Sequence, residues 1–274
     1  MADTSRADLV VTSSANPEIK AVKALATKKG RQQQNAFVSE GLRHVVEAAR
    51  AGWVIRRLIV ADKQAPSPVM DEARQACLDA GGRVITVSGE LMTRIAKRDN
   101  AQSVIAVIEQ KTSPLSAVTP EPGALWVALE SVRDPGNLGS VMRSADAFGA
   151  KGVILVGHTV DPFSIESVRA TMGAIVNVPL VRCDEAAFLD WRKSWPGRVV
   201  GTHLAGPHRP EGLRAPTPTV LLMGNEQAGL PTEMARACDT LVRIPMRPGA
   251  DSLNLAAATA IMLHGLAGGA GGLE

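Results

Sequence analysis

The stretch Ser131–Ala150, "SVRDPGNLGSVMRSADAFGA", lies between two apolar runs of the chain. The runs are "ALWVALE" (Ala124–Glu130) and "GVILVG" (Gly152–Gly157), and both are typical of strands buried on two faces. Pro135 and Gly136 predict a turn after the first strand, and the residues that follow have helical spacing. A strand, a helix and a second strand in this order predict a parallel pair joined by a crossover helix.

The same alternation continues through the second half of the chain. Strands are expected at Leu125–Leu129, Gly152–Val156, Arg198–Gly201, Thr219–Met223 and Leu241–Ile244. Helices are expected at Leu138–Phe148, Ile165–Gly173, Glu185–Ser194, Thr232–Ala237 and Asn254–Leu266. The predicted fold class is therefore α/β, with a mostly parallel sheet that has helices on both faces.

A linker at residues 113–123, within "KTSPLSAVTPEPG", predicts two domains, because Pro, Ser, Thr and Gly replace periodic apolar residues there. Residues 1–112 are expected to form a small α/β domain in which "NPEIKAVKALATKKG" (Asn16–Gly30) is a helix that ends at its glycine. Residues 124–267 are expected to form the second domain. The Gly-rich tail, residues 268–274, is expected to be disordered.

Charge is distributed unevenly along the 274 residues, although the net charge is only +3. Residues 1–112 carry 17 Lys/Arg and 12 Asp/Glu, and the remainder carries 13 and 15. An electropositive first domain favours a polyanionic partner such as a nucleic acid. Ordinary solvated surface charge is the alternative that this count leaves open.

Cysteine usage and hydropathy predict a cytoplasmic protein without a metal. Cys77, Cys183 and Cys238 are far apart, and neither they nor the five histidines form a motif with metal-ligand spacing. No apolar run approaches the roughly 20 residues that span a bilayer, and the N-terminus has no signal-peptide core. We therefore expect no membrane partner and no metal ion.

The turn at the start of the first crossover helix carries residues suited to bind an anion. Asn137 is placed to cap the helix, and Arg143 lies on its second turn. The side chain of Arg143 should lean back over Gly139, where the absence of a side chain leaves room for the guanidinium at the helix N-terminus. A plain capped helix with a surface arginine is the alternative.

Two further strand ends carry turns of unusual composition. "LLMGNEQAGLP" (Leu221–Pro231) contains Gly224, which permits close approach of the backbone, and Glu226. In "RIPMRPGADSLN" (Arg243–Asn254), Ser252 or Asn254 is expected to cap the last helix. Because the carboxyl ends of parallel strands meet at one edge of the sheet, all three turns should meet there.

These three turns resemble the motifs of the SpoU (TrmH-like) branch of the SPOUT RNA methyltransferases. The family's Asn-x-Gly with a following Arg is matched by Asn137, Gly139 and Arg143, and its Gly-x-Glu-x-x-Gly-Leu by Gly224, Glu226, Gly229 and Leu230. Its Ile-Pro-Met and Ser-Leu-Asn are matched by Ile244–Met246 and Ser252–Asn254. The first domain resembles the ribosomal-protein-like, RNA-binding α/β unit found in this family.

The resemblance implies a knotted fold and a methyl donor. The C-terminal segment of the family passes through an earlier loop as a deep trefoil knot, an exception to ordinary topology. S-adenosyl-L-methionine would bind in the knot at Gly224, Ile244, Met246 and Leu253. The glycine fingerprint of a Rossmann-type methyltransferase or of a nucleotide-dependent oxidoreductase, G-x-G-x-x-G after a first strand, is absent from the sequence.

The resemblance also implies methyl transfer to a ribose 2′-hydroxyl of structured RNA, with 23S rRNA slightly favoured over tRNA. Arg143 would act as the base or as an orienting and electrostatic group, and the pocket would be completed by Asn137, Glu226, Ser252 and Asn254. A homodimer is expected, with RNA phosphates bound by Lys20, Lys23, Lys28, Lys29 and Arg31. An RNA-binding ribosome-assembly factor that has lost the chemistry is the alternative function.

Overall fold

The computed structural model describes residues 8–210, 213, 215, 217–247, 249 and 252–267. The expected disorder of residues 268–274 concerns a segment outside these described residues. The chain forms two compact units. The first comprises Met1–Lys111 together with Phe163–Arg169, and the second comprises Thr112–Pro162 together with Ala170–Glu274.

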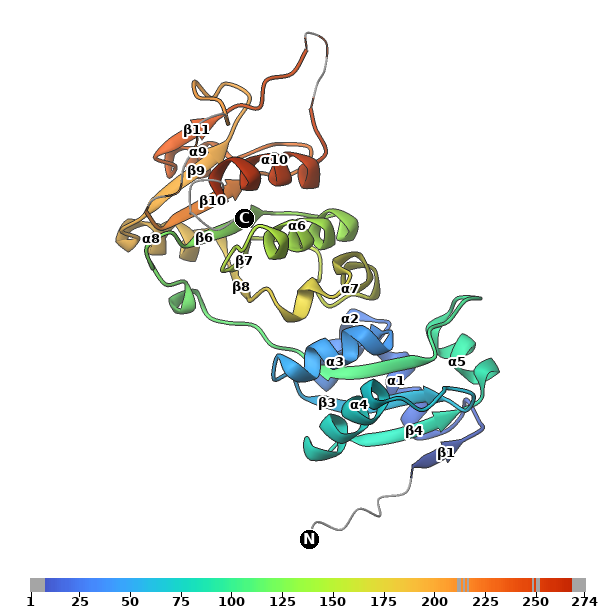
Figure 1. The fold of residues 1–274 in the computed structure, drawn as a ribbon. Coiled ribbons are helices and arrows are strands. Elements are labelled where there is room, and N and C mark those ends of the chain that lie inside the picture. Colours follow the sequence, from blue (N-terminus) through green and yellow to red (C-terminus); the bar gives the residue numbers. More distant parts are fainter. Residues whose placement is uncertain are drawn as a thin grey trace. The chain divides into compact units, whose positions relative to one another are not determined.

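The first unit is a five-stranded mixed sheet with helices around it (Figure 1). Its strand order is β1-β4-β3-β5-β2, in which β1, β4 and β3 are parallel and β5 runs antiparallel to both β3 and β2. The strands are β1 (Leu9–Val11), β2 (Ala36–Glu40), β3 (Ile55–Ala61), β4 (Arg83–Val87) and β5 (Val104–Glu109). The helices are α1 (Pro17–Ala24), α2 (Lys28–Gln34), α3 (Leu42–Arg50), α4 (Pro68–Asp79) and α5 (Gly89–Ala96).

The helix expected over Asn16–Gly30 is two helices, α1 and α2. Asn16 caps α1 as the sequence indicates, because its side chain accepts a 2.9 Å hydrogen bond from the backbone N–H of Glu18. The chain then turns, and the Thr27 hydroxyl caps α2 by accepting from Gly30 N at 3.1 Å. Gly30 is therefore a buried residue inside α2, where a side chain would collide with the backbone of Ala24.

The second unit is a six-stranded sheet in which every pair of neighbouring strands is parallel, in the order β11-β9-β10-β6-β7-β8. The strands are β6 (Leu125–Glu130), β7 (Gly152–Val156), β8 (Leu180–Cys183), β9 (Arg198–Thr202), β10 (Thr219–Met223) and β11 (Thr240–Val242). The helices are α6 (Pro135–Ala147), α8 (Glu185–Ser194), α9 (Thr232–Arg236) and α10 (Leu255–Ala267), and 3-10 turns occur at Leu115–Ala117 and Ala174–Val176. Helix α7 (Ile165–Thr171) begins in the segment assigned to the first unit and ends in the second.

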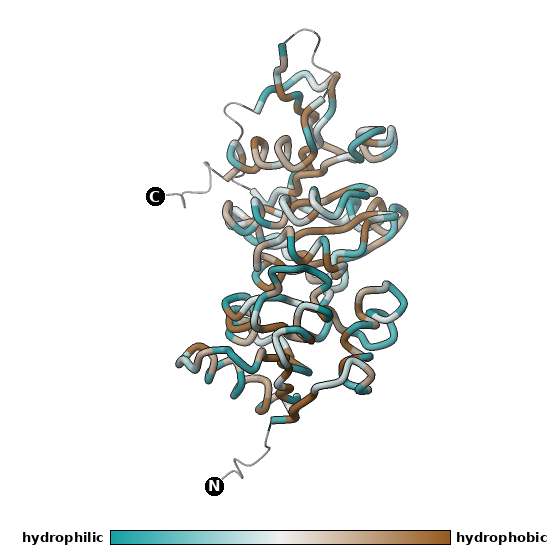
Figure 2. The backbone as a smooth tube through the Cα atoms, turned by 90° about the vertical axis from the view of Figure 1, so that its right-hand side faces the viewer, coloured by the Kyte–Doolittle hydropathy of each residue, from teal (hydrophilic) through white to brown (hydrophobic). Residues whose placement is uncertain are grey.

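The core of the second unit explains its apolar strands. Every residue of β6, β7 and β10 is buried, as expected for strands covered on both faces. One face packs on α8 and α9 through Phe188, Trp195 and Met234, and α10 packs against α6 and β10. Figure 2 shows hydrophobic (brown) stretches of the backbone alternating with hydrophilic (teal) ones. The predicted mostly parallel α/β fold is confirmed.

Two short strands were not predicted from the sequence. β1 has three residues and β8 has four, and one of the four in β8 is the exposed Arg182. Such short segments have no distinct periodicity, so their pairing depends on the neighbouring strand. The other predicted helices and strands of the second unit are present with small shifts at their ends, and no helix among the described residues is long and apolar enough to cross a membrane.

Candidate active site

Three segments of the second unit meet at the carboxyl edge of its sheet. Asn137 lies in the first turn of α6, which follows β6, and Glu226 and Asn254 lie in the segments that follow β10 and β11. The Asn137 side chain lies between the other two. Its Nδ2 donates a 3.1 Å hydrogen bond to Glu226 Oε1, and its Oδ1 accepts a 2.7 Å hydrogen bond from Asn254 Nδ2. One amide therefore joins all three segments that the sequence predicted to converge.

Asp134, and not Asn137, caps helix α6. The Asp134 carboxylate accepts a 2.6 Å hydrogen bond from the backbone N–H of Asn137, which is the third residue of the helix. The expectation that Asn137 caps this helix is therefore wrong. Because Asp134 satisfies the helix end, the side-chain amide of Asn137 is free to bind Glu226 and Asn254.

Asn254 caps helix α10, which decides between the two caps that the sequence left open. Its Oδ1 accepts hydrogen bonds from Ala256 N at 2.9 Å and Ala257 N at 3.3 Å. The same side chain thus uses its oxygen for the helix and its nitrogen for Asn137. Ser252, the other candidate, lines a cavity nearby.

The loop after β10 folds tightly on itself. The backbones of Asn225 and Gly229 exchange two hydrogen bonds of 3.2 and 2.9 Å. A side chain at Gly224 would collide with the backbone of Gly229 and Leu230, so the glycine permits this close approach within the loop itself. Asn225, which matches none of the predicted site residues, joins this loop to Ser131 through a 2.8 Å hydrogen bond from Nδ2 to the Ser131 carbonyl oxygen.

A cavity of about 440 Å³ lies at the ends of β9, β10 and β11. All four predicted cofactor residues line it, and so do two of the predicted catalytic residues: Gly224, Ile244, Met246, Leu253, Glu226 and Ser252. The volume is typical of a small-molecule site. Its apolar side chains suit an adenine ring, and the Glu226 carboxylate suits a cationic sulfonium, so the residues fit S-adenosylmethionine.

Arg143 is exposed and has no hydrogen bond or ion pair with any residue that the structure describes. It does not line the 440 Å³ cavity. The space over Gly139, expected to admit the guanidinium, is filled instead by the Ala170–Thr171 backbone, which lies 2.7 Å (Ala170 C) and 2.9 Å (Thr171 N) from the position of a Cβ on Gly139. Gly139 therefore permits packing of α6 against this segment, and that expectation is wrong.

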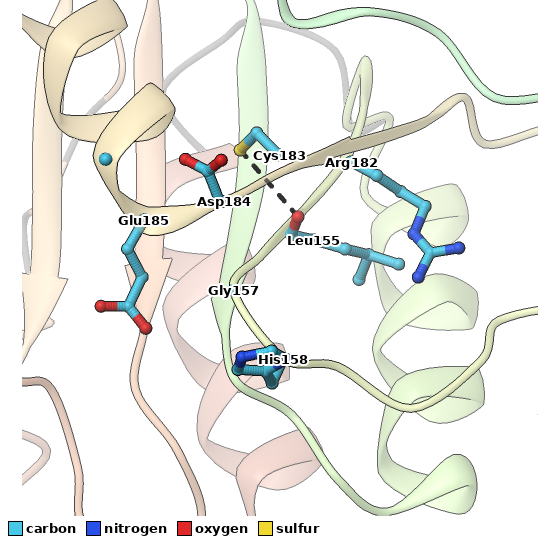
Figure 3. A pocket seen from close by; sticks show the side chains of 8 residues that line it. Leu155, Gly157, His158, Arg182, Cys183, Asp184 and Glu185 are labelled. Carbon is cyan, nitrogen blue, oxygen red and sulfur yellow. Dashed lines mark hydrogen bonds between the residues drawn. The ribbon is translucent and has the colours of Figure 1, made fainter.

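A second cavity of about 510 Å³ lies at the ends of β7 and β8. In Figure 3 the carboxylates of Asp184 and Glu185 lie to one side of Cys183 and the guanidinium of Arg182 to the other. Asp184 is engaged as the cap of α8, accepting from Ala187 N at 2.7 Å. None of the predicted site residues lines this cavity.

The thiols do not form a nucleophilic or metal site in the described part of the chain. Burial raises the pKa of Cys77 and Cys183 to about 11 and that of Cys238 to about 12, with Asp184 and Asp239 contributing at the last two. All three cysteines are free. Within the described residues, no three His, Cys, Asp or Glu side chains are grouped so as to hold a metal ion.

Four of the five predicted RNA contacts in the first unit reach solvent. Lys20, Lys28 and Lys29 are exposed and Lys23 is half-buried. Arg31 is only 4% exposed, and its guanidinium donates a 2.9 Å hydrogen bond to the Leu25 carbonyl oxygen between α1 and α2. Arg31 therefore holds the turn between these helices, and its assignment as a phosphate contact is wrong.

Both units of the chain match models of known protein families. A family model for the SpoU rRNA Methylase family matches residues 124–264, and one for the MRM3-like substrate binding domain matches residues 16–106. A 23S rRNA (uridine(2479)-2′-O)-methyltransferase of Streptomyces viridochromogenes is 32% identical, over 87% of this chain and 85% of its own length. The 23S rRNA (guanosine(2553)-2′-O)-methyltransferase RlmP of Bacillus subtilis is 28% identical, over 94% and 99%.

A solved structure has the same architecture over nearly the whole chain. The crystal structure of an AdoMet-bound rRNA methyltransferase from Sinorhizobium meliloti matches with a TM-score of 0.88 and 45% identity, covering 93% of this chain and 96% of that one. The fold and the site thus define an RNA ribose 2′-O-methyltransferase that uses S-adenosylmethionine, as the sequence predicted. The chain belongs to the SpoU rRNA methylase family.

Proposed function

We propose that this protein methylates a ribose 2′-hydroxyl of 23S rRNA at the site formed by Asn137, Glu226 and Asn254. The observation that carries the proposal is the pair of hydrogen bonds through which the Asn137 amide joins the other two side chains beside the 440 Å³ cavity. The two curated relatives named above act on 23S rRNA but at different nucleotides, a uridine and a guanosine. We therefore infer from these relatives which RNA is the substrate, and not which nucleotide is methylated.

The cavity residues would hold the methyl donor. When bound, S-adenosylmethionine supplies a methyl group activated by the positive charge on sulfur. The side chains of Ile244, Met246 and Leu253 would cover the adenine, and the closed loop from Asn225 to Gly229 would present backbone groups to it. Glu226 lines the same cavity and carries the charge that complements a sulfonium.

Arg143 would act on the RNA rather than on the donor. A ribose hydroxyl is a poor nucleophile until its proton is withdrawn or its developing negative charge is stabilised. A guanidinium presents N–H donors in a planar fork that matches a phosphate, and Arg143 has no partner within the described residues that would occupy it. It would orient the target through the adjacent phosphate and stabilise the emerging alkoxide, while Asn137 fixes the ribose.

A homodimer would complete this site. Arg143 does not line the cavity of its own chain. A second subunit would place its Arg143 beside this cavity, where the target ribose and its phosphate would be held. Helix α10 offers a surface for such contact, because its small residues include Ala257 beside the exposed Ile261. We also propose that the second unit is knotted as a trefoil. We further propose that the protein is located in the cytoplasm, a compartment in which its three free cysteines stay reduced.

The first unit would hold the RNA through Lys20, Lys23, Lys28 and Lys29. These lysines lie on α1 and α2, within the residues matched by the substrate-binding family model. Lysines bind phosphates without reading base sequence, so this contact would position the RNA and leave the choice of nucleotide to the second unit.

Two measurements test the proposed function. Purified protein should transfer methyl groups to a 23S rRNA transcript and not to tRNA, and a deletion strain should lack one 2′-O-methyl mark in 23S rRNA. The matched control is Arg143→Ala, which should bind the donor and leave the mark absent. A titration showing that wild-type protein does not bind S-adenosylmethionine would instead favour the assembly-factor alternative.

A further inference from the structure

The Asn225 side chain makes hydrogen bonds with all of its donor and acceptor groups. Its Nδ2 donates to the Ser131 carbonyl oxygen at 2.8 Å and to Glu226 Oε2 at 3.4 Å. Its Oδ1 accepts from Gln227 N at 2.9 Å and from Ala228 N at 3.3 Å. An asparagine amide has two donor hydrogens and two acceptor lone pairs, so this set is complete.

Only one orientation of the Asn225 amide is compatible with its neighbours. In the opposite orientation, its NH₂ group would face the two backbone N–H donors, and its oxygen would face the Ser131 carbonyl and the Glu226 carboxylate. The Asn225 Oδ1 atom binds backbone N–H groups within the loop after β10 and so holds that loop closed. The Nδ2 atom joins the same loop to Ser131, at the end of β6.

The acceptor on Ser131 is itself fixed to the sheet. The Ser131 N–H donates a 2.9 Å hydrogen bond to the Val156 carbonyl oxygen of β7, and Ser131 has a left-handed φ of +47°. Asn225 thus attaches the loop after β10 to the end of the buried strand β6. Glu226, the next residue, accepts hydrogen bonds at both carboxylate oxygens: Oε2 accepts from Asn225 Nδ2 and Oε1 accepts from Asn137 Nδ2.

We propose that Asn225 is a positioning residue for the methyl transfer, which holds the Glu226 carboxylate in the orientation that Asn137 requires. This inference rests on the proposed function. A carboxylate bound at both oxygens by amide donors has one orientation. Without the Asn225 donor, the carboxylate can rotate away from Asn137, and Asn137 loses the partner that sets its own amide relative to Asn254.

The variant Asn225→Asp separates the two sides of this amide. The carboxylate keeps an oxygen for Gln227 N and Ala228 N, so the loop and donor binding should be retained. Its second oxygen faces the Ser131 carbonyl and the Glu226 carboxylate, where an acceptor is repelled. At pH 8 we expect kcat to fall about 10- to 100-fold, the factor for a lost hydrogen bond to a charged group, with the Kd for S-adenosylmethionine changed less than about 3-fold.

A pH series gives a readout that a purely structural role would not. Two neighbouring carboxylates at positions 225 and 226 share a proton more readily than either would alone, and that proton restores a donor. The ratio of variant to wild-type kcat should therefore rise as the pH falls from about 8 to about 5.5, while Asn225→Ala should show no such recovery. Asp134, Glu185, His203 and Arg243 are the other charged or titratable groups near these loops, and wild type and variant share them, so the ratio isolates the change at position 225.

Asn177→Asp is the matched control, because it places the same new charge beside a carboxylate, Asp146, away from the three loops. It should keep wild-type kcat. The inference alone is overturned if Asn225→Asp turns over like wild type, or if it loses donor binding together with kcat and shows no recovery at low pH. If wild-type protein methylates no RNA, the proposed function fails and this inference fails with it.

Discussion

The side-chain nitrogen of Asn254 donates a 2.7 Å hydrogen bond to the side-chain oxygen of Asn137, although the two residues are 117 positions apart in the chain. The Asn254 oxygen simultaneously caps α10. This contact therefore couples the start of the last helix to the start of α6. It also fixes which way the Asn137 amide points, and so where its nitrogen meets Glu226.

Asn254→Asp should keep the helix cap and break this coupling. A carboxylate still accepts from Ala256 N and Ala257 N but cannot donate to Asn137. We expect Tm to change by less than about 2 °C, because the cap is retained, and kcat to fall at least about 10-fold. Thermal unfolding and single-turnover methyl transfer measure the two effects. A large fall in Tm together with the fall in kcat would contradict the expectation that the cap is retained while the hydrogen bond to Asn137 is lost.

Arg143→Lys tests whether the planar fork is needed. A lysine keeps the charge but offers a point charge on a flexible chain, so it cannot bind phosphate with two parallel hydrogen bonds. We expect turnover to fall about 10- to 100-fold, with donor affinity unchanged because Arg143 does not line the cavity. Arg236→Lys, at an exposed residue of helix α9, is the control. Near-normal turnover of Arg143→Lys would refute both roles considered for this arginine.

Gly139→Ala should destabilise the protein. The added methyl group would collide with Ala170, whose carbonyl carbon would lie 2.7 Å from it. Overpacking of this kind costs about 1–3 kcal/mol, so the urea midpoint should fall while Gly89→Ala, where a Cβ meets nothing within 4 Å, should not lower it. If Gly139→Ala instead abolished turnover with unchanged stability, this would support the original expectation that Gly139 leaves room for the Arg143 guanidinium.

Neutralising Lys20, Lys28 and Lys29 should weaken RNA binding in a salt-dependent way. Each phosphate contact contributes roughly 0.7 to 0.9 to the slope of log K against log[salt], so the triple alanine variant should flatten that slope by about 2. Methyl-donor affinity should not change.

Arg31→Ala provides the contrast within the same pair of helices. Its buried guanidinium holds the Leu25 carbonyl, so its loss leaves a buried acceptor unpaired and should lower stability by about 1–3 kcal/mol. A flatter slope of log K for RNA binding against log[salt], without a loss of stability, would show that Arg31 contacts an RNA phosphate after all.

The three cysteines should react slowly with alkylating agents in the folded protein. Burial raises their pKa from 9.0 to about 11 or 12, and raising a thiol pKa lowers the fraction of reactive thiolate at pH 8. Two units of pKa correspond to about 100-fold less thiolate. Mass spectrometry after iodoacetamide treatment should show this protection, and urea should remove it. Fast labelling of native Cys183 would show that its side chain is accessible as a thiolate.

The sequence by itself determined the alternation of strands and helices in the second unit, because apolar runs and helical spacing are local patterns. It also determined the family, because the residues around Asn137, Gly224 and Ser252 keep the order and spacing of the family's motifs. The site residues could be named for the same reason. Their arrangement could not, since nothing local relates Asn137 to Asn254.

Only the tertiary structure decided what each of these residues contacts. Asp134 took the helix cap expected of Asn137, Ala170 filled the space expected for Arg143, and Arg31 turned inward to Leu25. Asn225 emerged as a link because its four partners come from two loops. The physical reason is that a polar side chain binds the nearest unsatisfied group, and packing of distant segments decides which group that is.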